Sequence, residues 1–272
     1  MDTSAHDDDP LPGSTLEAER MPGHWLLARL GKRVLRPGGR ELTDRLLESL
    51  AIGADDHVVE LAPGLGSTTE LVLAAGPASY TGVDRDPAAA QRVHRLLDGP
   101  DRTVVQGSAA ATGLPSASAD VAFGEAYLTM QPARQKREIL HELARVVRPG
   151  GRIGVHEVAF APDDLDEKTA ARIADDLRSS IKVNVSPLTL AGWSALLDEA
   201  GFDEVEHMTA PLHLLEPRRL VSDEGLPGAL RFVSRVLRQP DARRRVLAMR
   251  SAMRSNADHL QACVITATRR AG

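Results

Sequence analysis

The sequence predicts an α/β fold with a mostly parallel central sheet. Short apolar segments typical of strands alternate with segments typical of helices, and such alternation places helices on both faces of a parallel sheet. A glycine-bearing loop, 62–66, follows the first strand, and the second strand ends in the carboxylate of Asp84. The expected strands lie at 57–61, 79–83, 102–106, 119–124 and 151–158, and the expected helices lie near 67–75, 86–97 and 132–147.

The N-terminal region precedes this alternation. Residues 1–13 are acidic and contain two prolines, which predicts a disordered tail. Ser14-Thr15-Leu16-Glu17 fits a capping box that opens a helix running toward Leu30, so residues 14–40 are assigned to an N-terminal cap helix. A break at Pro37-Gly38-Gly39 precedes a second amphipathic helix, whose apolar positions are Leu42, Leu46, Leu47 and Leu50.

The regular alternation of strands and helices ends after the fifth strand. A helix is expected at 166–182 and another from Thr189 to Ala200, followed by strands near 203–214 and 259–268. Two short helices, about 227–238 and 241–254, separate these strands. The expected organisation is therefore a core at 41–215 that includes a cap segment at 160–192, a helical cap insertion at 216–258, and a final core strand with the C-terminus at 259–272.

Composition excludes several classes of function. The net charge of -5 and the aromatic content of 3% argue against a nucleic-acid binder. The single cysteine, Cys263, lies in an apolar strand pattern and excludes an intrachain disulfide. No apolar run reaches the ~20 residues that span a bilayer, and the acidic N-terminus is unlike a signal peptide. We therefore expect a cytoplasmic protein without a membrane or nucleic-acid partner; the oligomeric state stays open.

The loop after the first strand predicts a nucleoside site. Glycines let the backbone approach a ligand, and a carboxylate at the end of the second strand can accept both ribose hydroxyls. A dinucleotide-binding loop needs a third glycine, and counting from Gly64 and Gly66 places Thr69 at that position. The bulky Thr69 argues against an NAD-dependent oxidoreductase.

Taken together, these motifs resemble those of class I S-adenosylmethionine-dependent methyltransferases of the small-molecule type. The resemblance covers roughly residues 40–215 and the last strand. It is carried by Glu60-Leu-Ala-Pro-Gly64-Leu-Gly66, Asp84, Gly113-Leu114-Pro115 before Asp120-Val-Ala-Phe123, Arg148-Pro149-Gly150-Gly151-Arg152, and Leu196–Phe202. It implies a Rossmann-like, mostly parallel seven-stranded sheet with an antiparallel C-terminal strand next to the fifth, plus a helical cap.

The resemblance also implies a cofactor, S-adenosyl-L-methionine, and the residues that hold it. Glu60 would organise the loop, the backbone of Ala62, Pro63, Gly64 and Gly66 would face the methionine end, and Asp84 would take the ribose, with Arg85 beside the adenine. Ala62 replaces the usual first glycine, which is tolerable if its φ is negative. The adenine side would be completed by Gly107, Ser108 and Ala109, although this segment lacks the acid that often holds the adenine amino group.

Polar residues at the ends of the fourth and fifth strands are the candidates for catalysis. Glu125 follows the fourth strand, while His156 and Glu157 end the fifth and point to opposite faces. Glu125 could act as general base, attract the sulfonium, or contact the methionine amine. His156 could be a hydrogen-bonded core histidine, and Glu157 could have a structural partner. No metal is expected, since no third oxygen ligand has matching spacing.

The predicted function is methyl transfer to an oxygen or nitrogen atom of a small-molecule metabolite. His24, Trp25, Tyr127 and His213 are the candidate substrate-binding residues, although packing roles are open for His24, Trp25 and His213. A catalytically silent module that binds the cofactor remains an alternative, and an NAD-dependent oxidoreductase is disfavoured by Thr69. The ten arginines in 216–254 fit either an anion-binding surface or a solvated helix face.

Overall fold

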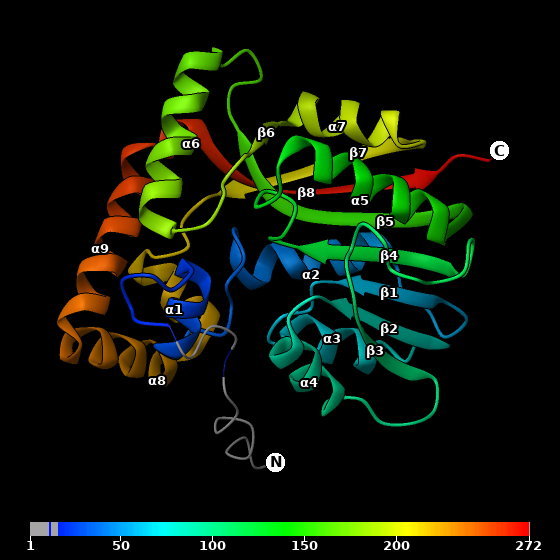
Figure 1. The fold of residues 1–272 in the computed structure, drawn as a ribbon, viewed down its shortest axis with the longest axis horizontal. Coiled ribbons are helices and arrows are strands. Elements are labelled where there is room, and N and C mark those ends of the chain that lie inside the picture. The colour runs from blue at the N-terminus through cyan, green and yellow to red at the C-terminus, as the bar shows by residue number, and fades with distance from the viewer. Residues whose placement is uncertain (1–10, 12–15, 272) are drawn as a thin grey trace.

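The computed structural model describes residues 11 and 16–271. Its centre is an eight-stranded sheet in the order β3-β2-β1-β4-β5-β8-β7, with the two-residue β6 paired to β5 outside this path (Figure 1). The strands are β1 (His57–Leu61), β2 (Ser79–Asp84), β3 (Arg102–Gln106), β4 (Ala119–Glu125), β5 (Val147–Phe160), β6 (Leu188–Thr189), β7 (Phe202–Pro211) and β8 (Leu260–Arg269).

The direction of β8 agrees with the sequence-based prediction. β8 lies between β5 and β7 and is antiparallel to both, whereas the other described strand pairs are parallel. The predicted Rossmann-like architecture, mostly parallel with an antiparallel C-terminal strand beside the fifth, is confirmed, and the short β6 adds an eighth strand to the seven predicted. Parallel strands end at the same edge of the sheet, so the residues after β1, β2 and β4 meet there.

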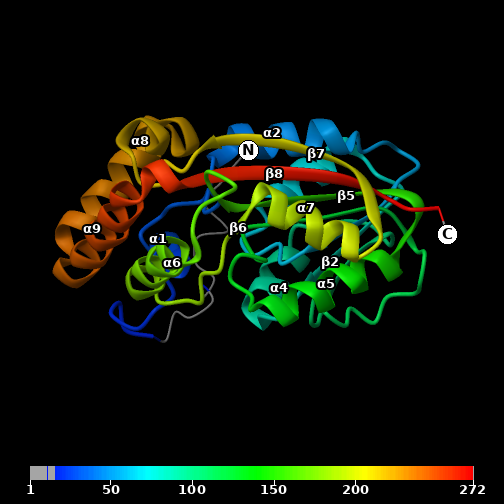
Figure 2. The same cartoon turned by 90° about the horizontal axis from the view of Figure 1, so that it is seen from above.

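Helices cover both faces of the sheet (Figure 2). Side chains from α2 (Gly39–Leu50), α3 (Ser67–Ala75) and α4 (Pro87–His94) form one apolar cluster with the sheet, and side chains from α5 (Ala133–Val146) and α7 (Leu190–Glu199) form another on it. The leucines of α2 follow the helical period, and Leu42, Leu46 and Leu50 are fully buried.

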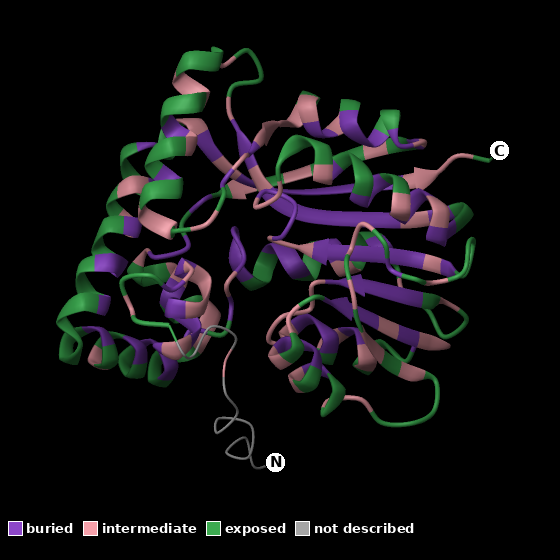
Figure 3. Ribbon diagram, viewed as in Figure 1, coloured by how far each residue is buried: buried purple, intermediate pink, exposed green. Residues whose placement is uncertain are grey.

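Four helices gather beyond the strand ends and form the cap (Figure 1). They are α1 (Gly23–Arg29), α6 (Glu167–Ile181), α8 (Pro217–Arg238) and α9 (Pro240–Ser255), and a short 3₁₀ helix, η1 (Ala257–His259), leads from α9 into β8. Leu27, Leu177, Phe232 and Met249 belong to a separate apolar cluster inside this cap. Figure 3 shows the outer sides of α8 and α9 largely exposed, so each helix presents one apolar stripe inward.

A buried ion cluster fixes the chain between α1 and α2 against α8. The Lys32 ammonium lies 3.4 Å from Asp223 and 3.5 Å from Glu224, with its side chain fully buried. The Glu224 carboxylate also accepts hydrogen bonds from the amides of Arg33 and Val34, each at 3.0 Å. This connection positions residues 33–37, which enter the functional site described below.

Two predicted helix boundaries are wrong. The N-terminal helix begins at Gly23 rather than near residue 14. Pro22 disfavours helical backbone at the preceding residue and is itself the N-cap, with a non-helical ψ of 137°. The helix predicted from 227 begins ten residues earlier, at Pro217, and bends at Gly225, whose φ is 69°. Most of the predicted tail, and Ser14 and Thr15 of the capping box, lie outside the described residues.

The close approach of α2 to β5 yields the first prediction. A β-carbon on Gly154 would collide with Leu46 and lie 3.1 Å from Leu50. Overpacking of this kind costs about 1–3 kcal/mol, so Gly154→Ala should lower the melting temperature by several degrees. Gly53→Ala is the matched control, because its nearest neighbour would be the Asp56 carboxylate at 3.8 Å. Equal melting temperatures for the two variants would contradict this packing.

Candidate functional site

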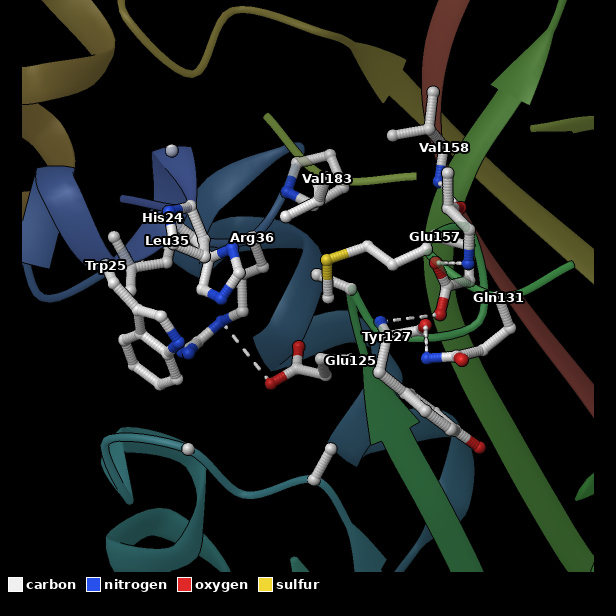
Figure 4. Close-up of a pocket in the computed structure, with 18 of the residues that line it drawn as sticks. His24, Trp25, Leu35, Arg36, Glu125, Tyr127, Gln131, Glu157, Val158 and Val183 are labelled. Atoms are coloured by element: carbon white, nitrogen blue, oxygen red, sulfur yellow. Dashed lines mark hydrogen bonds and ion pairs between the residues drawn. The ribbon is translucent and has the colours of Figure 1, made fainter. Parts of the chain in front are cut away.

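A cavity of about 590 Å³ lies between the carboxyl edge of the sheet and the cap. The glycine-bearing loop and Asp84 line one end, Arg36 and Glu125 line the middle, and side chains of α6 and α9 line the other end. Figure 4 shows the middle region, where residues from α1, residues 35 and 36, and the ends of β4 and β5 face one another. The volume is in the range of cavities that hold drug-sized ligands.

Asp84 closes one end of this cavity. Its carboxylate accepts a hydrogen bond from the Gly64 amide at 3.1 Å and another from the Asp86 amide at 2.9 Å. Burial raises the pKa of Asp84, while these two amides oppose the rise. Because a carboxylate has about four acceptor positions, two remain for hydroxyl groups of a ligand.

The backbone of the loop is left-handed at three positions. The φ angles are 54° at Ala62, 57° at Gly64 and 77° at Gly66. The sequence analysis accepted an alanine at position 62 on the condition that its φ is negative. The observed φ is positive, so Ala62 occupies a left-handed conformation that costs about 1–2 kcal/mol. Ala62, Pro63 and Gly64 line the cavity, whereas Gly66 lies at the N-cap of α3 and not among the lining residues.

Glu60 sits beneath this loop in a buried hydroxyl network. Its Oε2 accepts hydrogen bonds from Thr69 at 2.7 Å and Tyr80 at 2.6 Å. Burial raises the pKa of Glu60 to about 7, against the opposing effect of the two hydroxyl groups. Thr69, the residue that made a dinucleotide-binding loop unlikely, thus anchors α3 to Glu60 of β1.

The sequence analysis placed the adenine of the cofactor beside residues 107–109 and Arg85. Gly107, Ser108 and Ala109 all line the cavity, as does the exposed Arg85. The Ser108 hydroxyl accepts a hydrogen bond from the Ala110 amide at 3.2 Å, so it shapes the turn as well as the cavity wall.

Glu125 is surrounded by four donors from four segments of the chain. Its Oε1 accepts from the Thr43 hydroxyl at 2.6 Å and from His156 Nδ1 at 2.7 Å, while Oε2 accepts from the Thr68 hydroxyl. Arg36 Nε lies 3.4 Å from Oε2 (Figure 4). Although burial acts in the opposite direction, Arg36 and these hydrogen bonds lower the pKa of Glu125 to about 2.

This environment does not favour Glu125 as a general base. A carboxylate with a pKa near 2 is a weak base at neutral pH, and its acceptor positions are already in use. The arrangement favours a positioning role, in which Glu125 holds Arg36 at the middle of the cavity.

His156 is not among the cavity-lining residues. The ring is fully buried, and its Nε2 is hydrogen-bonded to the Pro37 carbonyl while Nδ1 faces Glu125. Both ring nitrogens face acceptors, which leaves neither for a substrate. The placement corresponds to the hydrogen-bonded core histidine that the sequence analysis left open.

Glu157 lines the cavity but is saturated by backbone amides. It accepts hydrogen bonds from Tyr127 at 3.0 Å, Leu128 at 2.7 Å and Thr129 at 2.9 Å (Figure 4). Burial raises the pKa of Glu157, and the amides oppose this effect. The residue fixes the loop after β4, so the structural partners that the sequence analysis left open for Glu157 are backbone amides.

The candidate substrate-binding residues fall into two groups. His24, Trp25 and Tyr127 line the cavity, and the tip of Trp25 lies 3.8 Å from where a β-carbon on Gly64 would stand. The Tyr127 ring packs against Gly124, and its hydroxyl is buried without a partner among the described residues. His213 is exposed and does not line the cavity, so its assignment is wrong: the flanking Leu212 and Leu214 point inward instead.

Sequence reasoning missed Arg36, Thr43 and Thr68. Each is an isolated polar residue near a helix start and belongs to no motif, and their convergence on Glu125 depends on the tertiary fold. The described residues contain no cluster of three His, Cys, Asp or Glu side chains suited to a metal ion. Within the same residues, the helices are too short or too polar to cross a bilayer.

Removing the charge of Glu125 should destabilise the fold. Glu125→Gln leaves Arg36 and His156 facing a neutral amide, and a broken buried ion pair costs on the order of 3 kcal/mol. The lowered pKa of Glu125 also means that its ionised form stabilises the folded protein. This contribution to the free energy of unfolding is fully present above the ordinary pKa of 4.5 and declines as the pH falls toward 2. Chemical denaturation measures the loss, with Glu41→Gln in an exposed ion pair as control. Equal unfolding free energies for both variants would contradict the buried network.

Comparisons with known proteins agree with this fold. A family model described as "Methyltransferase domain" matches residues 58–151, the segment from β1 into β5. An uncharacterized protein of Haemophilus influenzae is 32% identical over 220 residues, covering 79% of this chain and 86% of that protein. The 27-O-demethylrifamycin SV methyltransferase of Amycolatopsis mediterranei is 26% identical over 166 residues, covering 60% of this chain and 59% of that enzyme.

The fold is also found in a solved structure. Haemonchus contortus phosphoethanolamine N-methyltransferase 2, in complex with phosphomonomethylethanolamine and S-adenosylhomocysteine, aligns with a TM-score of 0.70 at 15% identity, covering 92% of this chain and 57% of that one. The chain thus spans less than two thirds of the length of this enzyme and of the rifamycin methyltransferase. Residues 58–151 thus match a methyltransferase domain, and the chain has the fold of the class I S-adenosylmethionine-dependent methyltransferases, whose cofactor is S-adenosylmethionine.

Proposed function

We propose that this protein transfers a methyl group from S-adenosylmethionine to an oxygen or nitrogen atom of a small molecule. The observation that carries the proposal is a single cavity that joins the Asp84 end of the sheet edge to a chamber lined by the cap. Such a cavity can hold the cofactor and a second molecule in contact. Relatives that methylate small molecules, such as the rifamycin enzyme, support this choice of substrate class.

The cofactor-binding end fits the proposed ligand. Asp84 retains acceptor positions for two ribose hydroxyls, and Gly64 allows the backbone to approach closely. Glu60 and the loop backbone would face the methionine ammonium, while the Arg36 guanidinium lies close enough to attract its carboxylate. The adenine would lie along residues 107–109.

The protein's own contribution is alignment and exclusion of water. S-adenosylmethionine, when bound, supplies an activated methyl group, so the chain has to hold both reactants in line in a dry site. Trp25 covers the glycine-bearing loop, and the cap helices close the far end. Glu125 fixes Arg36, and Glu157 fixes the loop at 127–129 through its three amides.

A catalytically silent module with the same fold is the second candidate. One observation favours it: both acids at the ends of β4 and β5 are hydrogen-bonded to the protein itself. Release of S-adenosylhomocysteine during incubation with a panel of small metabolites distinguishes the two. Turnover on at least one metabolite supports the enzyme, and tight product binding without turnover on the whole panel favours the silent module.

Asp84→Asn should weaken cofactor binding. The amide has a single acceptor oxygen, so one ribose hydroxyl or the Gly64 amide loses a charged partner, at about 1.5–3 kcal/mol. Calorimetric titration with S-adenosylhomocysteine measures the change, with the exposed Asp101→Asn as control. Unchanged affinity in Asp84→Asn would place the ribose elsewhere.

Cofactor affinity should depend on pH through Glu60. In the free protein its pKa of about 7 keeps it partly protonated at neutral pH, whereas a bound ammonium favours the ionised form. Binding should therefore release protons and tighten as the pH rises toward about 8, by at most tenfold per pH unit. Titrations in buffers of different ionisation enthalpy detect the released protons, and Glu60→Gln should abolish the pH dependence. A pH-independent affinity in the unmodified protein would argue against this role.

A further inference from the structure

The cap end of the cavity is lined largely by apolar side chains, with Asn184 as a polar neighbour of Val183. Leu177, Ile181, Val183, Leu214, Met249 and Met253 line it, and they come from α6, the segment after α6, the segment after β7, and α9. Four of these six side chains are less than 9% exposed, so this end of the cavity, here called the chamber, is closed by the cap. Transfer of apolar surface into such a site is favourable, whereas an unpaired polar group would lose its hydration.

The ionisable groups beside the chamber are poorly placed to remove a proton. Glu125 is held by four donors and Glu157 by three backbone amides, so neither carboxylate is free for a substrate hydroxyl. Glu60 and Asp84 also line the cavity, but they lie at its cofactor end, beside the glycine-bearing loop, so the remaining candidate beside the chamber is His24. Burial, with a contribution from Arg85, lowers the pKa of His24 to about 4, which makes the ring a weak base.

His24 nevertheless offers a polar contact. Its Nδ1 is buried without a hydrogen-bond partner in the described part of the chain, and the ring projects into the cavity between Leu35 and Arg36 (Figure 4). Arg33 and Arg85 also line the cavity. Besides the neutral amides of Gln131, Gln135 and Asn184, the polar groups that line the cavity here are a neutral imidazole and nearby cations. Cations suit an anionic oxygen better than an ammonium group.

Resting on the proposed methyl transfer, we propose that the chamber accepts an apolar small molecule whose oxygen nucleophile, a carboxylate or phenolate, is already ionised when it binds. A lone pair on that oxygen forms the new O–CH₃ bond while the C–S bond of the sulfonium breaks and its electron pair stays on sulfur. The product is a neutral methyl ester or ether with S-adenosylhomocysteine, and no proton has to move. Because no proton has to move, catalysis does not require Glu125 or Glu157 to be free of their protein donors.

Binding tests the apolar part of this proposal. We would titrate hexanoate, octanoate and decanoate into the protein by calorimetry, with and without saturating S-adenosylhomocysteine. Affinity should rise about fourfold for each added methylene until the chamber is filled. A hydroxylated acid or an alkylamine of the same length should bind at least tenfold more weakly than the matching alkanoate. Equal affinity across the chain lengths, or stronger binding of the amine, would overturn the proposal.

A pair of valine variants localises the effect. Val183→Asp places a carboxylate in the chamber wall and should weaken alkanoate binding at least tenfold while leaving S-adenosylhomocysteine affinity unchanged. Val221→Asp is the control, because Val221 is 42% exposed on α8 and does not line the cavity. Val183→Thr, which keeps the shape of valine, gives a smaller loss in the same direction if the aspartate variant fails to fold. Equal alkanoate affinities in the Val183 and Val221 variants would place the ligand elsewhere.

The pH dependence of turnover tests the ionised nucleophile. At saturating S-adenosylmethionine, which removes the pH dependence of cofactor binding, kcat/KM for an acidic phenol and for a weakly acidic phenol should rise tenfold per pH unit up to the pKa of each phenol and then level off. A common inflection for both phenols would reveal a protein base and overturn this part of the proposal. If S-adenosylhomocysteine itself fails to bind, the proposed function fails, while the titrations without it still report on the chamber.

Discussion

The carboxylate of Glu125 is the contact on which the site depends. It lies at the end of the central strand β4 and binds Arg36 from the segment before α2, Thr43 from α2, Thr68 from α3 and His156 from β5. These donors come from parts of the chain up to 120 residues apart, counted from Arg36 to His156. Because a buried charge is costly unless it is paired, this one carboxylate requires all four segments to meet at the sheet edge.

The position of the cap relative to the sheet depends on the segment that contains Arg36. Residues 33–37 run from the ion cluster of Lys32 and Glu224 to the Glu125 network, so they connect α8 to the end of β4. Inside the cap, an apolar cluster joins α1, α6, α8 and α9. A polar network on the core side and an apolar cluster on the cap side therefore define the two ends of one cavity. This asymmetry gives the cavity a charged end and an apolar end.

The sequence predicted the core better than the cap. Strand and helix periodicity, with Gly66 and Asp84 at the ends of elements, gave β1, α3 and β3 their observed bounds, because local patterning and burial agree there. The cap was harder, since Pro22 shortens α1 and Gly225 allows a helix to bend where sequence alone indicates a break. Ala62 shows another limit: its left-handed backbone is imposed by the loop and not by the residue.

Which residues line the cavity was most predictable where a sequence motif contained them. Glu60, Gly64 and Asp84 lie in the cavity as expected, whereas the roles of Glu125 and His156 depended on distant donors that no spacing reveals. His213 was misassigned because β7 ends at Pro211, and the side chains that line the cavity beyond this end are Leu212 and Leu214.

The most direct test is a crystal structure of the protein with S-adenosylhomocysteine. The account predicts that the ribose hydroxyls donate to Asp84, that the methionine end lies against Glu60 and Arg36, and that the sulfur faces the chamber. An adenosyl group bound outside this cavity, or a ribose with no contact to Asp84, would contradict the central claim.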